Sequence, residues 1–274
     1  MDKKLFLLLI LIFKMNLASA EVGAVSTATG GTGRGAVEPV DGLLLNPAML
    51  IDFPMQNFAF NYGSDEWALT VADNGKEAYF PAALQFVSRK TSVLETQKLG
   101  FSFGLPRWKR MGFGGTLSMV EYSNYPAVNL DQKYRQGVFD FGMTWAVGKN
   151  VGFGLVANRL ASTRTDLAAG LQLSKTIGMG LSYTYQNFSR FRFDIESAPE
   201  NKVDKLVYMI GIENYVNDWV VFRLGFQDNK VLAKDFLTAG LGFAGPQFGL
   251  HYAYITDVSN NNDQKHLIDL SVPF

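Results

Sequence analysis

The sequence contains no cysteine and only two histidines among its 274 residues. Without cysteine there are no disulfides, no thiol catalysis, no thiolate metal sites and no lipid-modified cysteine of the lipoprotein kind. Beyond Phe13, no apolar run approaches the ~20 residues that a transmembrane helix needs. If the chain lives in a membrane, it must therefore do so as a closed β-barrel, the other structure that satisfies every backbone group in lipid.

Charge and imidazole groups exclude further classes of function. The 25 Lys and Arg balance the 25 Asp and Glu, which gives no reason to expect nucleic acid as a partner. His251 precedes Tyr252 rather than the serine that outer-membrane lipid hydrolases place in their local motifs, and His266 lies beside Lys265. We therefore expect no enzyme activity, no catalytic residue, no metal site and no cofactor.

The first twenty residues are typical of an export peptide. A basic start at Lys3 is followed by an unbroken apolar run at 5–13 and by the small residues 18–20 that a signal peptidase needs. We predict a signal peptide over residues 1–20 and a mature chain that begins at Glu21 and forms one unit.

After residue 54 the hydrophobicity has a period of two. In residues 177–186 the odd positions are apolar or aromatic, whereas the even positions are glycine, serine, threonine or glutamine. Alternation in segments of about ten residues is typical of transmembrane β-strands, so the sequence predicts an all-β, antiparallel transmembrane barrel over residues 54–274. The predicted strands are 55–63, 66–73, 81–88, 97–105, 110–120, 136–147, 149–158, 166–174, 177–188, 203–214, 217–227, 235–244, 246–256 and 265–274. These are fourteen strands, with twelve as the alternative because the first three are short.

A soluble β-sandwich would alternate in the same way. Two features favour the barrel. The polar face is rich in Gly, Ala, Ser and Thr rather than in Lys and Glu, and large aromatic residues lie near strand ends, as in the girdle of a membrane barrel. These aromatic residues are Trp67, Trp145, Tyr185, Trp219 and Tyr254.

The connections between predicted strands are of two kinds. Gly148-Lys149-Asn150 and Gly245-Pro246 are tight and suit periplasmic turns. The longer, polar connections suit exposed outer loops, and they lie near 121–135, 189–202, 227–234 and 257–264.

The carboxy-terminal strand ends in an aromatic residue. Reading back from Phe274, every second residue is apolar, at Val272, Leu270 and Ile268. This pattern looks like the signal by which bacterial outer-membrane barrels are recognised for insertion. It predicts the outer membrane of a Gram-negative bacterium as the location, with the barrel-assembly machinery and outer-membrane lipid as partners.

Residues 21–53 do not alternate and carry the most specific local pattern. A glycine-rich stretch at 30–35 is followed by an acidic spacer and by an apolar run into Asn46-Pro47-Ala48. The glycines lack the G-x-G-x-x-G spacing of a phosphate-binding loop, and Asn46-Pro47 alone could simply start a turn. The residues singled out are Gly31, Gly33, Arg34, Gly35, Asn46, Pro47 and Ala48.

Together these residues resemble the amino terminus of the FadL-type long-chain fatty acid transporters and their relatives, which include the PorV-type secretion subunits. The resemblance implies a fourteen-stranded barrel whose lumen holds residues 21–53 as a plug, with the Asn-Pro-Ala box near the wall. Such transporters carry long apolar outer loops that receive lipid. This chain has no comparable loop, which argues against fatty acid uptake.

Several inward positions of the predicted barrel are charged or strongly polar. They are Lys98, Asp140, Asn158, Glu213, Arg223, His251 and Asp269. Charge on this face requires a wet lumen or pairing between the charges. We expect Arg223 to pair with Glu213 and His251 with Asp269, as bridges that brace the wall or as part of a solute path.

Two functions follow as expectations. The first is a passive channel for small hydrophobic or amphipathic solutes, with residues 21–53 as its plug. The alternative is a barrel that transports nothing and serves as an anchor or a subunit for another envelope protein.

Overall fold

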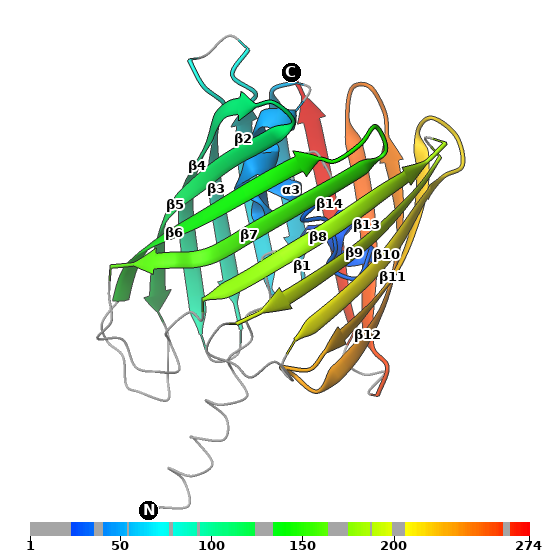
Figure 1. The fold of residues 1–274 in the computed structure, drawn as a ribbon. Coiled ribbons are helices and arrows are strands. Elements are labelled where there is room, and N and C mark those ends of the chain that lie inside the picture. The colour runs from blue at the N-terminus through cyan, green and yellow to red at the C-terminus, as the bar shows by residue number, and fades with distance from the viewer. Residues whose placement is uncertain are drawn as a thin grey trace, which may run out of the picture.

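The computed structural model describes residues 23–35, 41–53, 55–76, 79–91, 94–123, 134–163, 175–186, 188–198, 206–259 and 264–274. These residues form a closed barrel of fourteen strands, each antiparallel to its neighbours in sequence, and β1 pairs with β14 to close the sheet (Figure 1). The predicted barrel and its strand number are therefore confirmed. The expected signal peptide, residues 1–20, lies outside the described residues. Among the described residues, no helix is long and apolar enough to span a membrane.

The strands follow one another around the barrel in sequence order. They are β1 (Asn57–Gly63), β2 (Glu66–Asp73), β3 (Ala82–Lys90), β4 (Glu95–Trp108), β5 (Met111–Ser123), β6 (Tyr134–Ala146), β7 (Val151–Ser162), β8 (Thr176–Tyr185), β9 (Ser189–Ser197), β10 (Val207–Tyr215), β11 (Val220–Asn229), β12 (Lys234–Ala244), β13 (Gly249–Asp257) and β14 (Gln264–Pro273).

Strand β9 corrects the sequence interpretation. We expected a loop at 189–202 and a strand at 166–174, but residues 189–197 form a strand and the segment 166–174 lies outside the described residues. The charged residues of β9 suggested a loop. They are tolerated in a strand because they alternate with apolar residues, so that Phe191 and Phe193 face outward while Arg192 is buried inside the barrel.

The two faces of the sheet have the expected chemistry. Leu181 is 46% exposed on the outside, whereas the next residue, Ser182, is 7% exposed and faces inward. Apolar side chains cover the outside along every strand, as lipid contact requires. Outward aromatic residues lie near strand ends, as at Trp67 near the start of β2 and Trp145 near the end of β6.

The carboxy-terminal strand closes the barrel. Its outward residues Ile268 and Leu270 are exposed, as is the terminal Phe274, and Val272 pairs with Phe58 of β1. The backbone N–H of Phe274 donates to Gln56 O at 3.1 Å, so pairing with β1 continues to the last residue. We call the end of the barrel where β14 finishes, at the top of Figure 1, the C-terminal rim.

Candidate functional site: the luminal segment and its seat

The described residues 23–35 and 41–53 lie inside the barrel, and we call them the luminal segment (Figure 1). They include α2 (Ala24–Ala28), α3 (Asp41–Leu45) and the 3-10 helix η1 (Pro47–Asp52). Helix α2 packs against β11 to β14, and η1 packs against β4 to β6. The segment therefore touches the wall on two different sides of the lumen.

The first contacts join α2 to the last strands of the barrel. The backbone N–H of Ala24 donates to Asp269 Oδ2 at 2.5 Å, and small side chains let the helix lie close to Ala253. After the helix, Gly30 N donates to Thr238 Oγ1 at 3.0 Å, and the same hydroxyl donates to Ala28 O at 3.1 Å. Polar groups of the wall thus satisfy the backbone where the helix ends.

Gly30 allows the chain to turn close to the wall. Its φ of 74° is in the left-handed region, where glycine carries no Cβ penalty. A Cβ at this position would lie 2.6 Å from Phe226 O and 2.8 Å from Ile210 O, both backbone atoms of the sheet. Only glycine fits this turn without moving the wall.

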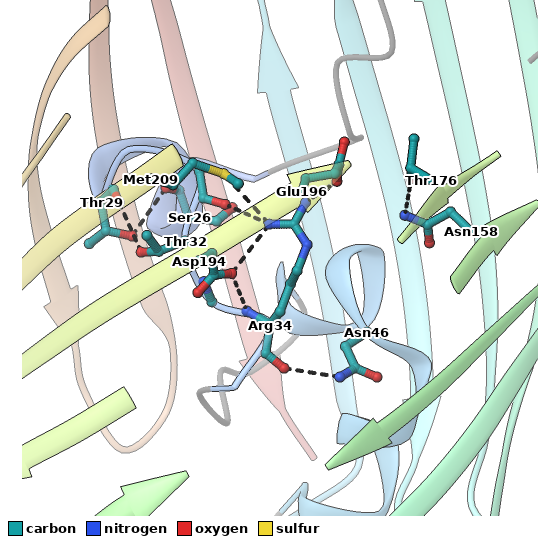
Figure 2. Close-up of polar contacts among 12 residues, drawn as sticks. Ser26, Thr29, Thr32, Arg34, Asn46, Asn158, Thr176, Asp194, Glu196 and Met209 are labelled. Carbon is teal, nitrogen blue, oxygen red and sulfur yellow. Dashed lines mark hydrogen bonds and ion pairs between the residues drawn. The ribbon is translucent and has the colours of Figure 1, made fainter. Parts of the chain in front are cut away.

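Arg34 makes the most concentrated set of polar contacts (Figure 2). Its Nη1 lies 3.2 Å from Asp194 Oδ2, and its Nη2 forms an ion pair with Glu196. The backbone N–H groups of Gly33 and Arg34 also donate to Asp194 Oδ2, at 3.1 Å and 2.9 Å. Arg34 is 2% exposed and Asp194 is 1% exposed, so this network is closed to solvent.

The charge of Arg34 is maintained by its partners. Burial alone would lower the pKa of the guanidinium, but the negative charges of Glu196 and Asp194 outweigh it and raise the pKa above its usual value. A permanent cation is thus held between two carboxylates of β9. We call Arg34, Asp194 and Glu196 the ionic latch.

Inward glycines of the wall make room for the backbone around Arg34. A Cβ on Gly154 would collide with the carbonyl oxygen of Arg34, and a Cβ on Gly180 would lie 2.9 Å from Arg34 Cβ. Ser182 Oγ donates to Gly35 O at 2.8 Å. The wall of β7 and β8 is therefore shaped to receive residues 34 and 35 at van der Waals distance.

Asn46 links the two described parts of the luminal segment to the wall. Its Nδ2 donates to Arg34 O at 2.9 Å and to Met143 O of β6 at 3.1 Å, and its Oδ1 accepts from Ala48 N at 3.1 Å. The last bond caps η1, which begins at Pro47. The Asn-Pro-Ala box thus lies against β6 and β5, where Gly142 and Gly114 face it.

The expected inward polar residues occupy two separate regions. On β4 to β8, Lys98 Nζ lies 4.0 Å from Asp140 Oδ2, Asp140 Oδ1 accepts from Arg159 N at 2.6 Å, and Asn158 Nδ2 donates to Thr176 Oγ1 at 3.1 Å. On β10 to β14 lie Glu213, Arg223, His251 and Asp269.

Glu213 is the centre of the second region. Its carboxylate is paired with Arg223 Nε at 2.6 Å, as expected, and also with Arg190 and Arg192 at 3.2 Å each. The three arginines surround a group that is fully buried. Such burial is tolerated because the charge is paired and hydrogen-bonded.

The expected pair of His251 with Asp269 needs correction. The two residues are register partners on β13 and β14, but the His251 Nδ1 contact is with Arg223 Nη1, at 3.2 Å. Asp269 instead accepts from Ala24 N of the luminal segment. A buried carboxylate next to the first turn of α2 can satisfy a backbone N–H group of the helix start, and this is the bond that Asp269 makes here.

Sequence reasoning missed Arg190, Arg192, Asp194 and Glu196, because their segment was assigned to a loop. The signal that identifies them is the alternation of these charges with Phe191, Phe193 and Ile195. A loop has no reason to keep this period, whereas a strand between lipid and a polar lumen does.

A closed fourteen-stranded barrel with an apolar outer face, an inward face of small and polar residues and an amino-terminal segment in its lumen is the fold that the FadL-like resemblance predicted. The comparison with solved structures agrees. The Ralstonia pickettii toluene transporter TbuX superposes with a TM-score of 0.71 at 14% identity, over 93% of this chain and 99% of that chain.

Two further solved structures share the fold. The Pseudomonas putida toluene transporter TodX gives a TM-score of 0.68 at 12% identity, over 93% of this chain and 99% of that one. A Pseudomonas aeruginosa FadL homologue gives 0.63 at 10% identity, over 91% and 97%. No family model matches the sequence, and no curated protein matches it. At these identities the likeness shows the fold, which confirms the fourteen-stranded barrel that the resemblance implied.

Proposed function

We propose that this protein is an outer-membrane channel for small hydrophobic or amphipathic solutes, closed at rest by the luminal segment. The C-terminal rim faces the periplasm in this proposal. The observation that carries it is the way in which the segment is held. Its polar attachment to the wall includes hydrogen bonds, the ionic latch set against inward glycines, and an ion pair between Asp52 and Arg107 of β4. Such polar contacts can be exchanged for contacts with water or solute.

The fold supports the same function. Solved barrels that resemble this one include toluene transporters, although their low identity leaves the solute of this chain to be determined by its own lumen. The apolar residues Leu43, Leu50 and Phe53 of the luminal segment pack against Ala72 and Ala83 of the wall. Displacement of these side chains would expose an apolar surface to an entering solute.

The close fit of the segment also supports the alternative function. Backbone atoms of residues 29, 30, 34 and 35 lie against glycines of β7, β8, β10 and β11. This close fit suits a barrel that anchors or assembles with another envelope protein. The two functions differ in whether the luminal segment can leave the wall and open the lumen.

Conductance distinguishes them. We expect removal of residues 22–40 from the mature chain to raise single-channel conductance in a planar bilayer, and to speed the entry of a hydrophobic naphthylamine dye into cells that carry the variant. The full-length chain and a Gly148→Ala variant, whose position has open space around it, are the controls. A deletion variant that folds but stays electrically silent and impermeable would exclude the channel and favour the anchor.

A further inference from the structure

One row of inward residues crosses the wall from β2 to β5. Thr70 is the register partner of Gln85, Gln85 of Gly100, and Gly100 of Ser118. We call these four residues the polar row. Because strands in a sheet lie about 4.8 Å apart, the row is a continuous patch on one side of the lumen.

The polar side chains of this row are buried without hydrogen-bond partners. Thr70, Gln85 and Ser118 are 1%, 2% and 6% exposed. Within the described part of the chain, Thr70 Oγ1, Gln85 Nε2 and Ser118 Oγ have no partner. Buried polar groups in proteins are almost always hydrogen-bonded, so three in one row indicate a missing polar partner.

Neighbouring polar residues of the same wall behave differently. In the adjacent pair toward the C-terminal rim, Ser102 Oγ and Thr116 Oγ1 hydrogen-bond to each other at 2.7 Å. Farther around the wall, Asn158 of β7 bonds to Thr176 of β8. The wall can therefore satisfy its own hydroxyl and amide groups. Among the described residues, Asn57, Asn61 and Thr256 also have a side-chain oxygen without a partner, but the polar row brings three such groups together in one register row.

Gly100 leaves a notch in the row. An atom at its Cβ position would lie 3.2 Å from Ser118 Oγ and 3.6 Å from Gln85 Oε1. At other inward glycines, such as Gly154 and Gly225, that position meets the luminal segment, whereas at Gly100 the three nearest heavy atoms all belong to side chains of the wall. The notch is thus flanked by polar atoms and holds no part of the luminal segment among its nearest neighbours.

Apolar residues border part of the row on each side. Toward the C-terminal rim, Ala72 and Ala83 lie beside Thr70 and Gln85 and pack against Leu43 of the luminal segment, whereas the hydrogen-bonded pair Ser102 and Thr116 lies beside Gly100 and Ser118. Toward the opposite rim lie the buried residues Val87 and Val120, with Lys98 as the register partner of both. The surface therefore offers hydrogen bonds along the row and apolar contact beside it at these alanines and valines.

We infer that the polar row binds the hydroxyl or amide group of an uncharged amphipathic solute, whose apolar part lies against Val87 and Val120. This inference rests on the proposed function and specifies its solutes. The row itself holds no charged side chain, and the adjacent Lys98 lies 4.0 Å from the carboxylate of Asp140, so the row fits a neutral polar group. A threonine and a serine hydroxyl together with an amide can both donate to and accept from a phenol or alcohol.

The test uses two fluorinated probes that differ by one hydroxyl group. We expect 4-fluorophenol to bind the full chain in lipid nanodiscs with a saturable ¹⁹F shift, and to bind more tightly than fluorobenzene. In the Gln85→Leu/Ser118→Ala variant, 4-fluorophenol affinity should fall about tenfold or more, while fluorobenzene binding is unchanged, because only the hydroxyl loses its partners.

Two further variants sharpen the result. Gly100→Ala fills the notch without removing a polar group and should also weaken 4-fluorophenol binding. Asn158→Leu removes an amide that already has a partner and should leave it unchanged. Far-ultraviolet circular dichroism and heat-modifiable migration on gels verify that each variant is folded.

Other results would contradict the inference. Equal 4-fluorophenol affinities in the full chain and the Gln85→Leu/Ser118→Ala variant would overturn the inference, as would parallel losses for both probes. If nuclear Overhauser contacts detect ordered water at the row and no saturable probe shift occurs, the row is a hydration site and the inference fails. Binding requires no passage through the lumen, so a bound probe in a barrel that never conducts would retain the site and reject only the channel.

Discussion

Removal of the Arg34 guanidinium should release the luminal segment. Arg34→Met keeps a long side chain but leaves Glu196 without its ion-pair partner, and Asp194 retains only the backbone N–H groups of Gly33 and Arg34. Breaking a buried ion pair by deleting one partner costs about 3–5 kcal/mol. Because two backbone donors to Asp194 remain, we expect a cost near the lower end, about 3 kcal/mol.

The absence of cysteine makes this cost measurable with one introduced thiol. Thr27 in α2 is 4% exposed and its hydroxyl has no hydrogen-bond partner among the described residues, so Thr27→Cys is a mild change. A water-soluble maleimide can label this thiol only when residues 23–35 leave their seat. At about 1.4 kcal/mol per factor of ten, a cost of about 3 kcal/mol should raise the labelling rate of the Thr27→Cys/Arg34→Met protein roughly 100-fold.

Two controls define the result. Arg135→Met removes an ion pair with Glu121 in which the arginine side chain is 66% exposed, and it should change labelling little because exposed pairs contribute about 0–1 kcal/mol. Adding Asp194→Asn and Glu196→Gln to Arg34→Met removes the unpaired charges and should recover most of the protection. If Arg34→Met labels at the rate of the parent, the ionic latch does not hold the segment and the reasoning is wrong.

Three further changes test the wall and the closing strand. Gly154→Val should speed labelling of Thr27→Cys, because its Cβ would collide with Arg34 O, whereas Gly148→Ala should not; equal rates would contradict the fit of the seat. Leu181→Arg should lower the free energy of unfolding in urea by about 2–4 kcal/mol, with Leu181→Met close to the parent, and an unchanged midpoint would show that Leu181 does not face lipid. Phe274→Asp should sharply reduce heat-modifiable barrel in cell membranes while Pro273→Ser should not, and similar yields would argue against Phe274 as an assembly signal.

The architecture could be predicted from the sequence because a membrane barrel imposes one period everywhere. Each strand separates lipid from the lumen. The outward position of Leu181 and the inward position of Ser182 can therefore be predicted from their own polarity, without knowledge of the partner strand. The even number of strands follows from closure, because the first and last strands of an antiparallel barrel pair antiparallel only when the number is even. Strand β9 was not predicted, because its charged residues suggested a loop even though they alternate with apolar residues.

The seat of the luminal segment could not be predicted, because its contacts join distant parts of the chain. Arg34 and Asp194 are 160 residues apart, and nothing local in either stretch identifies the other. Their meeting depends on the register between β8 and β9, which places Gly180 opposite Asp194, and on the absence of a side chain at Gly180. The sequence shows that glycines face the lumen, but only the closed barrel shows which of them receive the segment.

The same geometry explains why charge and glycine occur together on this part of the wall. A carboxylate such as Asp194 can be buried only if a cation and backbone N–H groups reach it, and Arg34 reaches it only because Gly154, Gly178 and Gly180 let its backbone and side chain lie against the sheet. The carboxylates of β9 and the glycines of β7 and β8 therefore form one binding site for Arg34. In the proposed channel, departure of the luminal segment would require water to replace Arg34 at both carboxylates. The opened lumen would then be wet beside β9 and apolar where Leu43 had covered Ala72 and Ala83. A lumen with these two sides suits an amphipathic solute better than a purely apolar one.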